Sequence, residues 1–353
     1  MHHTFLAAVD AGYHSVKVFT ATHQIRIPTS VSRAPHLTAT ALALEASRQH
    51  RYEISGTHYL VGADIRDPIQ TRHDEFPMSG ASLAVVTDAL RQVIPEGGKV
   101  RIVTGAPFSN YFGADGQPRN FELNRRINAL TRPVRDLSGS PIPRIVSVNV
   151  IAQAVAGWFD YALEERGIDA ERFSQCTAVI DIGGRTTDVA VMQRGEIDLR
   201  ASGTKDLGTL ELSAAVHRAI DEHIPGISRR SHSFIEEAIR RGVAKVGDRE
   251  IDIQDLIDRE KTYLLDRITD YLAGLHGRFM TDVDTLLWIG GGAALLESAL
   301  RKRYPRSEFL PDPQMANARG MWKFEIYSNA QDDKPEPDDL EFAQDEFADN
   351  HAG

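Results

Sequence analysis

The stretch TAVIDIGGRTTDVAVM (residues 177–192) determines how this chain is expected to fold. Its first apolar segment ends at Asp181, and Gly183 and Gly184 follow where a tight turn needs residues without side chains. A second alternating segment begins after the turn and contains Asp188. Two short alternating segments joined by a glycine turn are typical of a β-hairpin, which is what we predict here.

Two other stretches follow a related pattern. FLAAVDAGYHSVKVFT (5–20) contains Asp10 before the turn and Lys17 after it, so it also predicts a hairpin. In TLLWIGGGAALLESAL (285–300), a strand instead enters a glycine-rich turn followed by helical spacing of apolar residues. The two hairpins begin 172 residues apart, which suggests a duplicated half-domain plan.

The remainder of the chain mixes strands and helices, so we predict an α/β fold class. Alternation predicts a hairpin over 51–62 and strands over 100–107 and 145–150, whereas helical spacing predicts helices over 82–94, 121–130, 151–167, 209–223, 233–244 and 255–279.

Composition limits the function classes. The chain has 353 residues, 42% of them hydrophobic and 25% charged, which suits a globular protein of two domains. A single cysteine, Cys176, favours a reducing compartment. Residues 286–296 form the densest apolar stretch and are far short of the ~20 residues that span a bilayer. The apolar run at the N-terminus is too short for a signal peptide, so we expect a cytoplasmic protein that does not enter membranes.

The net charge of −10 is concentrated at the C-terminal end. Residues 331–353 contain nine acidic residues and one basic residue, which leaves 41 acidic and 39 basic residues in the rest of the chain. The segment has too few apolar residues for a core, so we expect it to be disordered. Because the body is nearly neutral, net charge alone says little about nucleic-acid binding.

The glycine turns carry the chemistry. Backbone N–H groups in such turns can hold an anion, and Lys17 adds positive charge. Asp10 and Asp181 at the tips of two hairpins could hold a hydrated Mg²⁺, although two unrelated hairpins with solvated aspartates would show the same pattern. The run Gly290 to Gly292 would let a flat ligand such as adenine approach the backbone. Neither G-x-G-x-x-G nor a P-loop motif is present.

Taken in order, the two D-x-G hairpins and the G-G-G turn resemble the nucleotide site of the actin, Hsp70 and sugar-kinase superfamily. Within it the chain is most similar to the ParM/StbA plasmid-segregation actins, and the resemblance covers most of residues 5–325. It is carried by VRIVTGAPFSNYFGADGQPRN (100–120), SGTKDLGTLELSAAVHRAI (202–220), WIGGGAALLESALRKR (288–303) and NARGMWKF (317–324). NVIAQAVAGW (149–158) resembles the actin segment that presents a water-positioning glutamine, here Gln153.

The resemblance implies that the chain binds ATP and Mg²⁺. It places the phosphate-binding turns at Asp10, Gly12, Tyr13, His14, Lys17, Asp181, Gly183, Gly184, Arg185 and Thr186. It further implies that Asp10 and Asp181 orient Mg²⁺ through waters, that Gln153 aligns the attacking water with help from Asp188, and that Gly290, Gly291 and Gly292 face the adenosine. Tyr13 and His14 depart from the small polar residues usual in the first turn.

The resemblance also implies an actin-like fold of two related domains flanking a nucleotide cleft. Domain I would comprise 1–157 with 315–330 returning to it, domain II 158–314, and the acidic tail 331–353. The implied function is an ATPase that forms nucleotide-dependent filaments with itself. A DNA-binding adaptor protein would connect these filaments to plasmid DNA, without direct contact between the chain and nucleic acid.

Two alternatives remain open. One is a non-polymerising ATP-binding scaffold, which the sequence does not distinguish from a filament protein. The other is a small-molecule kinase, which needs a carboxylate as general base near Gln153. Residues 148–157 contain neither Asp nor Glu, which favours water as the phosphoryl acceptor.

Overall fold

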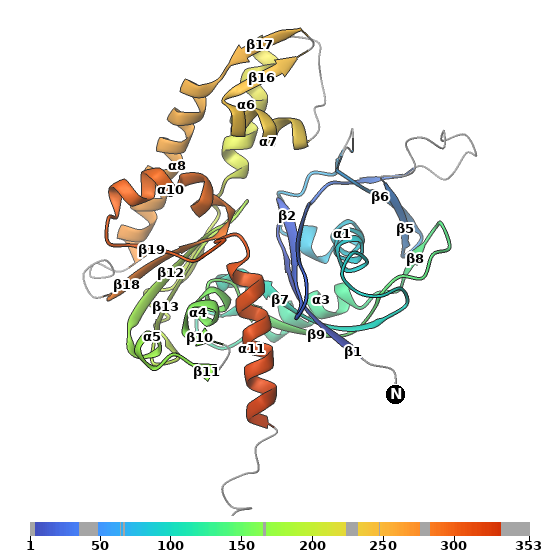
Figure 1. Cartoon of the computed structure of the whole chain (residues 1–353), viewed down its shortest axis with the longest axis horizontal. Coiled ribbons are helices and arrows are strands. Elements are labelled where there is room, and N and C mark those ends of the chain that lie inside the picture. The colour runs from blue at the N-terminus through green and yellow to red at the C-terminus, as the bar shows by residue number, and fades with distance from the viewer. Residues whose placement is uncertain are drawn as a thin grey trace, which may run out of the picture.

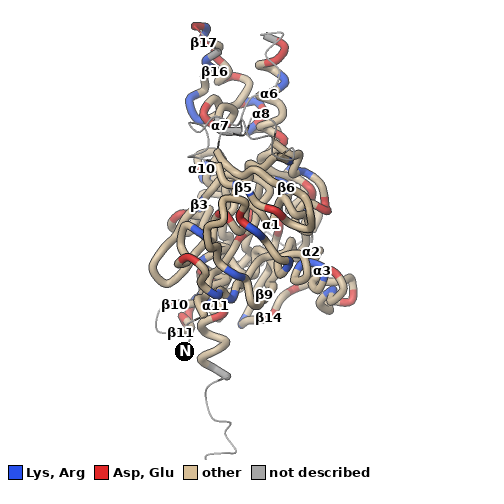
Figure 2. Tube along the Cα trace, turned by 90° about the vertical axis from the view of Figure 1, so that its right-hand side faces the viewer, with Lys and Arg blue, Asp and Glu red and all other residues tan. Residues whose placement is uncertain are grey.

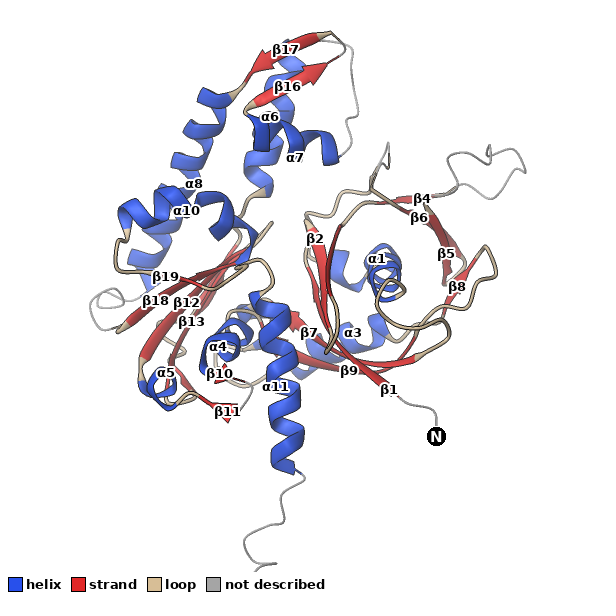
Figure 3. Cartoon of the chain, in the orientation of Figure 1, coloured by secondary structure: helices blue, strands red, loops and turns tan. Residues whose placement is uncertain are grey.

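The computed structural model describes residues 4–34, 49–63, 65, 68–164, 167–223, 232–246, 248–275 and 283–332. The fold is α/β, as predicted: two mixed β-sheets lie on either side of a central region, with helices packed on them (Figures 1 and 3). Most of the acidic segment 331–353 lies outside the described residues, so its disorder stays a prediction. In the described part of the chain, no helix has the length and apolar character needed to cross a membrane.

The first half of the chain contains a five-stranded sheet in the order β3-β2-β1-β7-β9. The strands are β1 (Thr4–Ala11), β2 (Ser15–Phe19), β3 (Gln24–Pro28), β7 (Lys99–Ala106) and β9 (Arg144–Ala152). The hairpin β1–β2 confirms the first motif, and its antiparallel register places Asp10 opposite Lys17. Strands β7 and β9 run parallel to β1, so the turn after β1 and the ends of β7 and β9 meet at one edge.

A second, antiparallel sheet curves around the helix α1 (Gly80–Leu90) (Figure 1). It consists of β4 (Val31–Arg33), β5 (His50–Ile54), β6 (Thr57–Val61) and β8 (Val134–Asp136), and its β5–β6 pair confirms the predicted hairpin. The Ser79 side chain accepts a hydrogen bond from the Ser82 N–H and caps α1. Every residue of α1 is buried, which fits a helix that is apolar on most of its faces and enclosed by strands.

The second half of the chain is built on a sheet in the order β14-β13-β12-β18-β19, with β15 pairing to β13. Its strands are β12 (Cys176–Ile182), β13 (Thr187–Gln193), β14 (Glu196–Ile197), β15 (Gly203–Lys205), β18 (Thr285–Ile289) and β19 (Glu308–Phe309). The hairpin β12–β13 confirms the second motif and aligns Asp181 with Asp188. Strand β18 runs parallel to β12, as β7 does to β1, so the two halves repeat one plan.

Helices and short strands complete the two halves. The first half adds η2 (Phe76–Met78), α2 (Phe108–Tyr111) and α3 (Asn120–Leu130). The second adds α4 (Val155–Ala162), β10 (Leu163–Glu164), β11 (Gly167–Ile168), α5 (Ala170–Ser174), α6 (Leu210–His223), α7 (His232–Arg241), β16 (Val243–Val246), β17 (Arg249–Asp252), α8 (Gln254–Leu275) and α10 (Gly290–Arg303).

The last helix, α11 (Ala316–Asp332), contacts α4 and also β1, β2 and β7. The two helices approach closely at Gly320, because a Cβ there would collide with the carbonyl of Ala156. Met321 joins the same contact by packing in a buried cluster with Ala8 and Val103 of the first sheet. The chain therefore returns to its N-terminal sheet after completing the second one (Figure 1).

Three predicted boundaries differ from the structure. The helix expected over 151–167 begins only at Val155, because Gln153 continues the strand pairing and Ala154 adopts a positive φ of 64°. The helix expected over 233–244 ends at Arg241, and the following residues enter the hairpin β16–β17. The three glycines expected in a turn instead form the first turn of α10.

Candidate functional site

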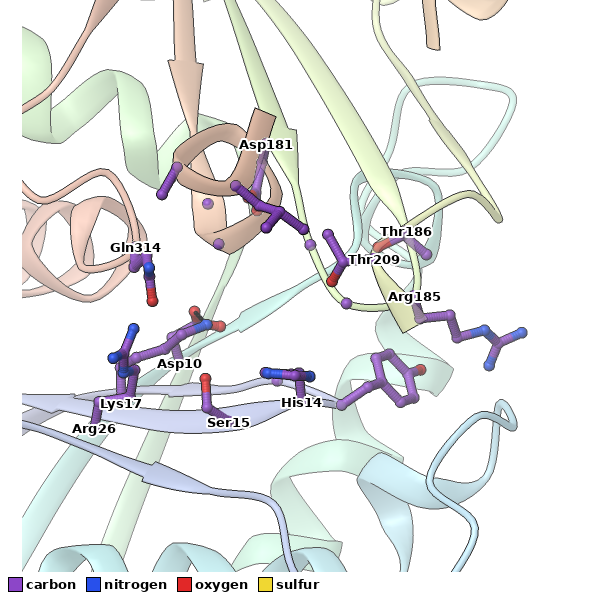
Figure 4. A pocket seen from close by; sticks show the side chains of 18 of the residues that line it. Asp10, His14, Ser15, Lys17, Arg26, Asp181, Arg185, Thr186, Thr209 and Gln314 are labelled. Atoms are coloured by element: carbon purple, nitrogen blue, oxygen red, sulfur yellow. Dashed lines mark hydrogen bonds and ion pairs between the residues drawn. The ribbon is translucent and has the colours of Figure 1, made fainter. Parts of the chain in front are cut away.

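A cavity of about 560 Å³ lies where the two hairpin turns face each other. Figure 4 shows Asp10 and Lys17 on one side of it and Asp181 on the other. The predicted site residues that line it are Asp10, Gly12, Tyr13, His14, Lys17, Gln153, Asp181, Gly183, Gly184, Arg185, Thr186, Gly290 and Gly291. The two sequence motifs therefore predicted residues that line opposite sides of a single cavity.

The first hairpin places a charged pair at the cavity. Lys17 Nζ donates to Asp10 Oδ2 at 2.9 Å, since the two residues are opposite each other in the β1–β2 register. Gln153 Nε2 donates to the other oxygen, Asp10 Oδ1, at 3.0 Å. Asp10 is only 3% exposed, so its negative charge is held by these two donors and not by bulk water.

Gln153 owes its position to local backbone geometry. Its N–H donates to the Ala106 carbonyl at 2.7 Å, which extends the β7–β9 pairing by one residue. The following residue, Ala154, has φ 64°, a left-handed conformation that is unusual for a residue with a side chain. Such strain is often found where a fold holds a functional side chain in place. Here it fixes the start of α4 directly after Gln153.

The second hairpin has two carboxylates where the first has an ion pair. Asp181 lies opposite Asp188 in the β12–β13 register. Asp188 accepts from the Phe108 N–H at 2.7 Å, the Thr204 hydroxyl at 2.6 Å and the Thr186 hydroxyl at 2.8 Å. Asp188 does not line the cavity, whereas Thr186 does. Asp188 therefore influences the cavity indirectly, by fixing the Thr186 hydroxyl through a hydrogen bond.

Burial raises the pKa of both carboxyl groups in the second hairpin. The pKa of Asp181 rises to about 7 because it is buried, and because the charges of Asp10 and Asp188 repel its own. The pKa of Asp188 is also raised, chiefly by burial and against the three hydrogen bonds it accepts. A positive ion in the cavity would reverse this effect on Asp181.

Two of the three glycines at the start of α10 line the cavity, and the third packs against β12. Gly290 has φ +90°, and a Cβ there would press on the Asp181 carboxylate and the Ile182 carbonyl. Gly290 and Gly291 line the cavity, whereas a Cβ at Gly292 would meet the Ile182 side chain. Of the three glycines expected to face the adenosine, Gly290 and Gly291 line the cavity, whereas Gly292 allows α10 to pack against β12.

Tyr13 and His14, which depart from the family pattern, connect the two hairpins. The Arg185 guanidinium lies 5.3 Å from the centre of the Tyr13 ring, a distance typical of a cation–π contact. His14 Nε2 hydrogen-bonds to Glu236 on α7, and a Cβ on Gly184 would lie 3.0 Å from that of His14. In Figure 4, Arg185 extends away from the cavity, where it pairs with Asp74 at 2.7 Å.

Sequence reasoning missed Asn317, which does not line the cavity but hydrogen-bonds to Asp181, and it missed several residues of the cavity wall. Asn317 on α11 donates to Asp181 Oδ2 at 2.6 Å, and its own buried Oδ1 has no hydrogen-bond partner within the described residues. Arg126 on α3 lines the cavity. Its helical spacing from buried Ala129 and Leu130 was a signal that this arginine faces inward. The other missed lining residues are Ala11, Ser15, Arg26, Pro28, Pro77, Pro107, Thr209, Leu212, Ser213, Glu236, Ile239, Arg240, Ala294, Leu295 and Gln314.

Comparisons with known proteins agree with this geometry. The family model for the N-terminal domain of actin like proteins matches residues 8–155, and that for the C-terminal part of the archaeal actin homologue MreB-like matches residues 179–302. The chain belongs to the actin-like proteins. The comparison of this actin-like chain with curated proteins found no match.

Solved structures show that this actin-like protein has the actin-like fold. A non-polymerisable quadruple mutant of pCBH ParM is similar with a TM-score of 0.73 and 18% identity, over 92% of this chain and 99% of that one. A 15-stranded ParM filament from Clostridium botulinum gives a TM-score of 0.69 at 17% identity, over 92% and 99%. An archaeal actin homologue in complex with ADP gives 0.69 at 18% identity, over 90% and 98%.

The residues present suit a nucleotide and a hydrated metal ion. Gly290 packs directly against the Asp181 carboxylate and the Ile182 carbonyl, whereas a Cβ at Gly291 would meet nothing within 4 Å, so a ligand can approach the backbone at Gly291. The two carboxylates of Asp10 and Asp181 line the cavity and offer oxygen atoms to metal-bound waters. Mg²⁺ prefers such a site, with few direct protein ligands and several waters.

Proposed function

We propose that this actin-like chain is an ATPase whose nucleotide-bound form assembles into filaments. One observation supports this most strongly: aspartates from two hairpins of the same design, Asp10 and Asp181, line one cavity together with the glycines of both turns. Phosphoryl transfer depends mainly on positioning and charge neutralisation, which such an arrangement provides.

The proposed division of labour follows from the hydrogen bonds. Lys17 and the N–H groups of the two turns would bind the β- and γ-phosphates. Gln153, held by Asp10, would orient the attacking water. Asp188 would act as a positioning residue, because its hydrogen bond fixes the Thr186 hydroxyl at the cavity. Gly290 and Gly291 would lie against the adenosine.

Asp10 and Asp181 would hold Mg²⁺ through waters, with Asn317 beside them. When bound, the ion would neutralise charge that develops on the transferred phosphoryl group. The chain's own contribution would be a rigid frame, since Asp10 is fixed by Lys17 and Gln153, and Asp181 by Asn317.

The filament part of the proposal rests on similarity to ParM structures, one of them a filament. Plasmid DNA segregation in the cytoplasm is the biological role we propose, with a DNA-binding adaptor protein as the connection to DNA. Acidic and basic residues are interspersed over the side of the molecule shown in Figure 2, which favours indirect over direct DNA contact.

Sedimentation of the purified chain with ATP, ADP or no nucleotide tests the proposal. We expect pelleting to depend on ATP and protein concentration, with phosphate release following assembly. Absence of ATP-dependent pelleting would contradict the filament function. If ADP forms only when a small hydroxyl compound is added, and the phosphoryl group ends on that compound without release of phosphate, the kinase alternative is correct instead.

Gln153→Ala tests the assignment of the water-orienting residue. We expect phosphate release to slow by about 100-fold, as for loss of a positioned catalytic group, while ATP still supports pelleting. The measurements are phosphate release and pelleting on the same preparations. A variant that hydrolyses ATP normally but no longer pellets would contradict the assignment.

A further inference from the structure

Arg126 is a buried cation at the cavity, and none of the residues that the structure describes forms a hydrogen bond or ion pair with it. It lies on α3, is 7% exposed and lines the same cavity as Asp10 and Gln153. Its Nε is shielded from solvent and has no hydrogen-bond partner, and the described part of the chain supplies no ion-pair partner either. The guanidinium stays protonated at all physiological pH values, although burial lowers its pKa.

An unpaired buried charge is costly, so folded proteins normally pair such groups. The Asp10 carboxylate, whose negative charge acts on Arg126, is already engaged, because it accepts hydrogen bonds from Lys17 and Gln153. The adjacent Arg125 shows the ordinary arrangement, since it pairs with Glu75 at 2.7 Å and Glu122 at 3.1 Å. Arg126 therefore lacks the carboxylate partners that Arg125 has on the same helix.

The residues that line the cavity with Arg126 indicate which kind of anion it binds. Its charge acts on Asp10 and Tyr13, which belong to the first turn. The apolar residues Leu212, Ile239 and Leu295 line the cavity from the second half of the chain and suit a base. Arg126 lines the same cavity as Asp10 and Gln153, and its planar guanidinium fork matches the geometry of a phosphate group.

We infer that Arg126 binds the terminal phosphate of the bound nucleoside triphosphate, and so makes the cavity distinguish triphosphate from diphosphate. This inference rests on the proposed function, because it concerns the same cavity. The same fork would also hold phosphate freed by hydrolysis, since both are phosphate anions. Arg126 would act as a specificity-determining residue, whereas Lys17 and the turn amides would serve both nucleotides.

Calorimetric titration of Arg126→Met with a non-hydrolysable ATP analogue and with ADP tests the inference. Loss of a charge-assisted hydrogen bond predicts a fall of about tenfold or more in affinity for the analogue. We expect less than about a twofold change for ADP, because it lacks the terminal phosphate. Arg125→Met is the matched control and should leave both affinities unchanged, since Arg125 pairs with carboxylates outside the cavity.

Two further measurements separate the outcomes. Addition of inorganic phosphate to the ADP-bound protein should raise its melting temperature in the wild type but not in Arg126→Met. Without ligand, Arg126→Met should melt at the wild-type temperature or above, because an unpaired buried charge is removed. Equal losses for ATP analogue and ADP, or an unchanged ratio of the two affinities, would overturn the inference and leave the proposed function intact.

A wild-type chain that binds neither nucleotide would overturn the proposed function. In that situation, the change in melting temperature on addition of inorganic phosphate alone tests whether Arg126 binds an anion. Stabilisation of the wild type but not of Arg126→Met would support an anion site, and no stabilisation of either would overturn it.

Discussion

The two hairpins that face the cavity have the same backbone design and opposite electrostatics. At equivalent positions, β1–β2 sets Asp10 against Lys17, whereas β12–β13 sets Asp181 against Asp188. The first pair neutralises itself through a 2.9 Å contact. The second does not, and burial with the nearby charges of Asp10 and Asp188 raises the pKa of Asp181 to about 7.

Of the two hairpins, only the second therefore holds a charged group at its end that no opposite charge on its own strands compensates. The first hairpin is stable as it stands, whereas the second is complete only when a cation or a proton compensates Asp181. Three substitutions, at Lys17, Asp181 and Arg185, test this contrast.

The largest effect is expected for Lys17→Met. It leaves the Asp10 carboxylate buried beside Gln153 without a positive partner, and loss of one partner of a buried pair costs about 4 kcal/mol. Urea unfolding of the ligand-free protein measures the loss. The double variant with Asp10→Asn is the control and should recover most of the stability. If the double variant is as unstable as Lys17→Met, the ion pair is not the cause.

A smaller effect, of opposite sign, is expected for Asp181→Asn. A carboxyl group whose folded pKa is raised stabilises the fold fully below its unfolded pKa, near 4, and this stability is lost as the pH rises through about 7. Between pH 5 and 8 the ligand-free wild type should therefore lose about 3 kcal/mol of unfolding free energy relative to Asp181→Asn. Urea unfolding at several pH values tests this. A difference between the two proteins that does not change with pH would contradict it.

The smallest effect is expected for Arg185→Gln in the turn of the second hairpin. Its partners Asp74 and Asp206 are largely exposed, so the loss should be about 0.5 kcal/mol and should disappear in high salt. Thermal unfolding at low and high ionic strength is the measurement. A loss of more than about 2 kcal/mol would show that this turn depends on its ion pairs as strongly as the first turn does.

The sequence predicted the features that depend on neighbouring residues. Strand, glycine turn and return strand lie within one short stretch, so both hairpins and the positions of Asp10 and Asp181 were predictable. Gln153 was located by resemblance and does line the cavity. Its backbone geometry was not predictable, because the left-handed conformation of Ala154 follows from the pairing of β9 and the packing of α4.

The residues that the sequence analysis missed lie on elements far in sequence from the residues that they contact. Asn317 hydrogen-bonds to Asp181 although the two residues are 136 positions apart, so no local sequence pattern predicts the contact. Glu236 meets His14 across 222 positions. The pairing of charges at the cavity likewise depends on tertiary contacts: Lys17 pairs with Asp10, whereas no residue in the described part of the chain pairs with Arg126.

The central claim is that the aspartates of both hairpins act on one metal-bound nucleotide. A double-mutant cycle of Asp10→Asn and Asp181→Asn, with ATP affinity measured by calorimetry with and without Mg²⁺, tests it most directly. The account predicts one ATP per chain, a coupling energy of about 1 kcal/mol or more in Mg²⁺, and loss of that coupling in its absence. Additive effects of the two variants in Mg²⁺, or no ATP binding by the wild type, would contradict the claim.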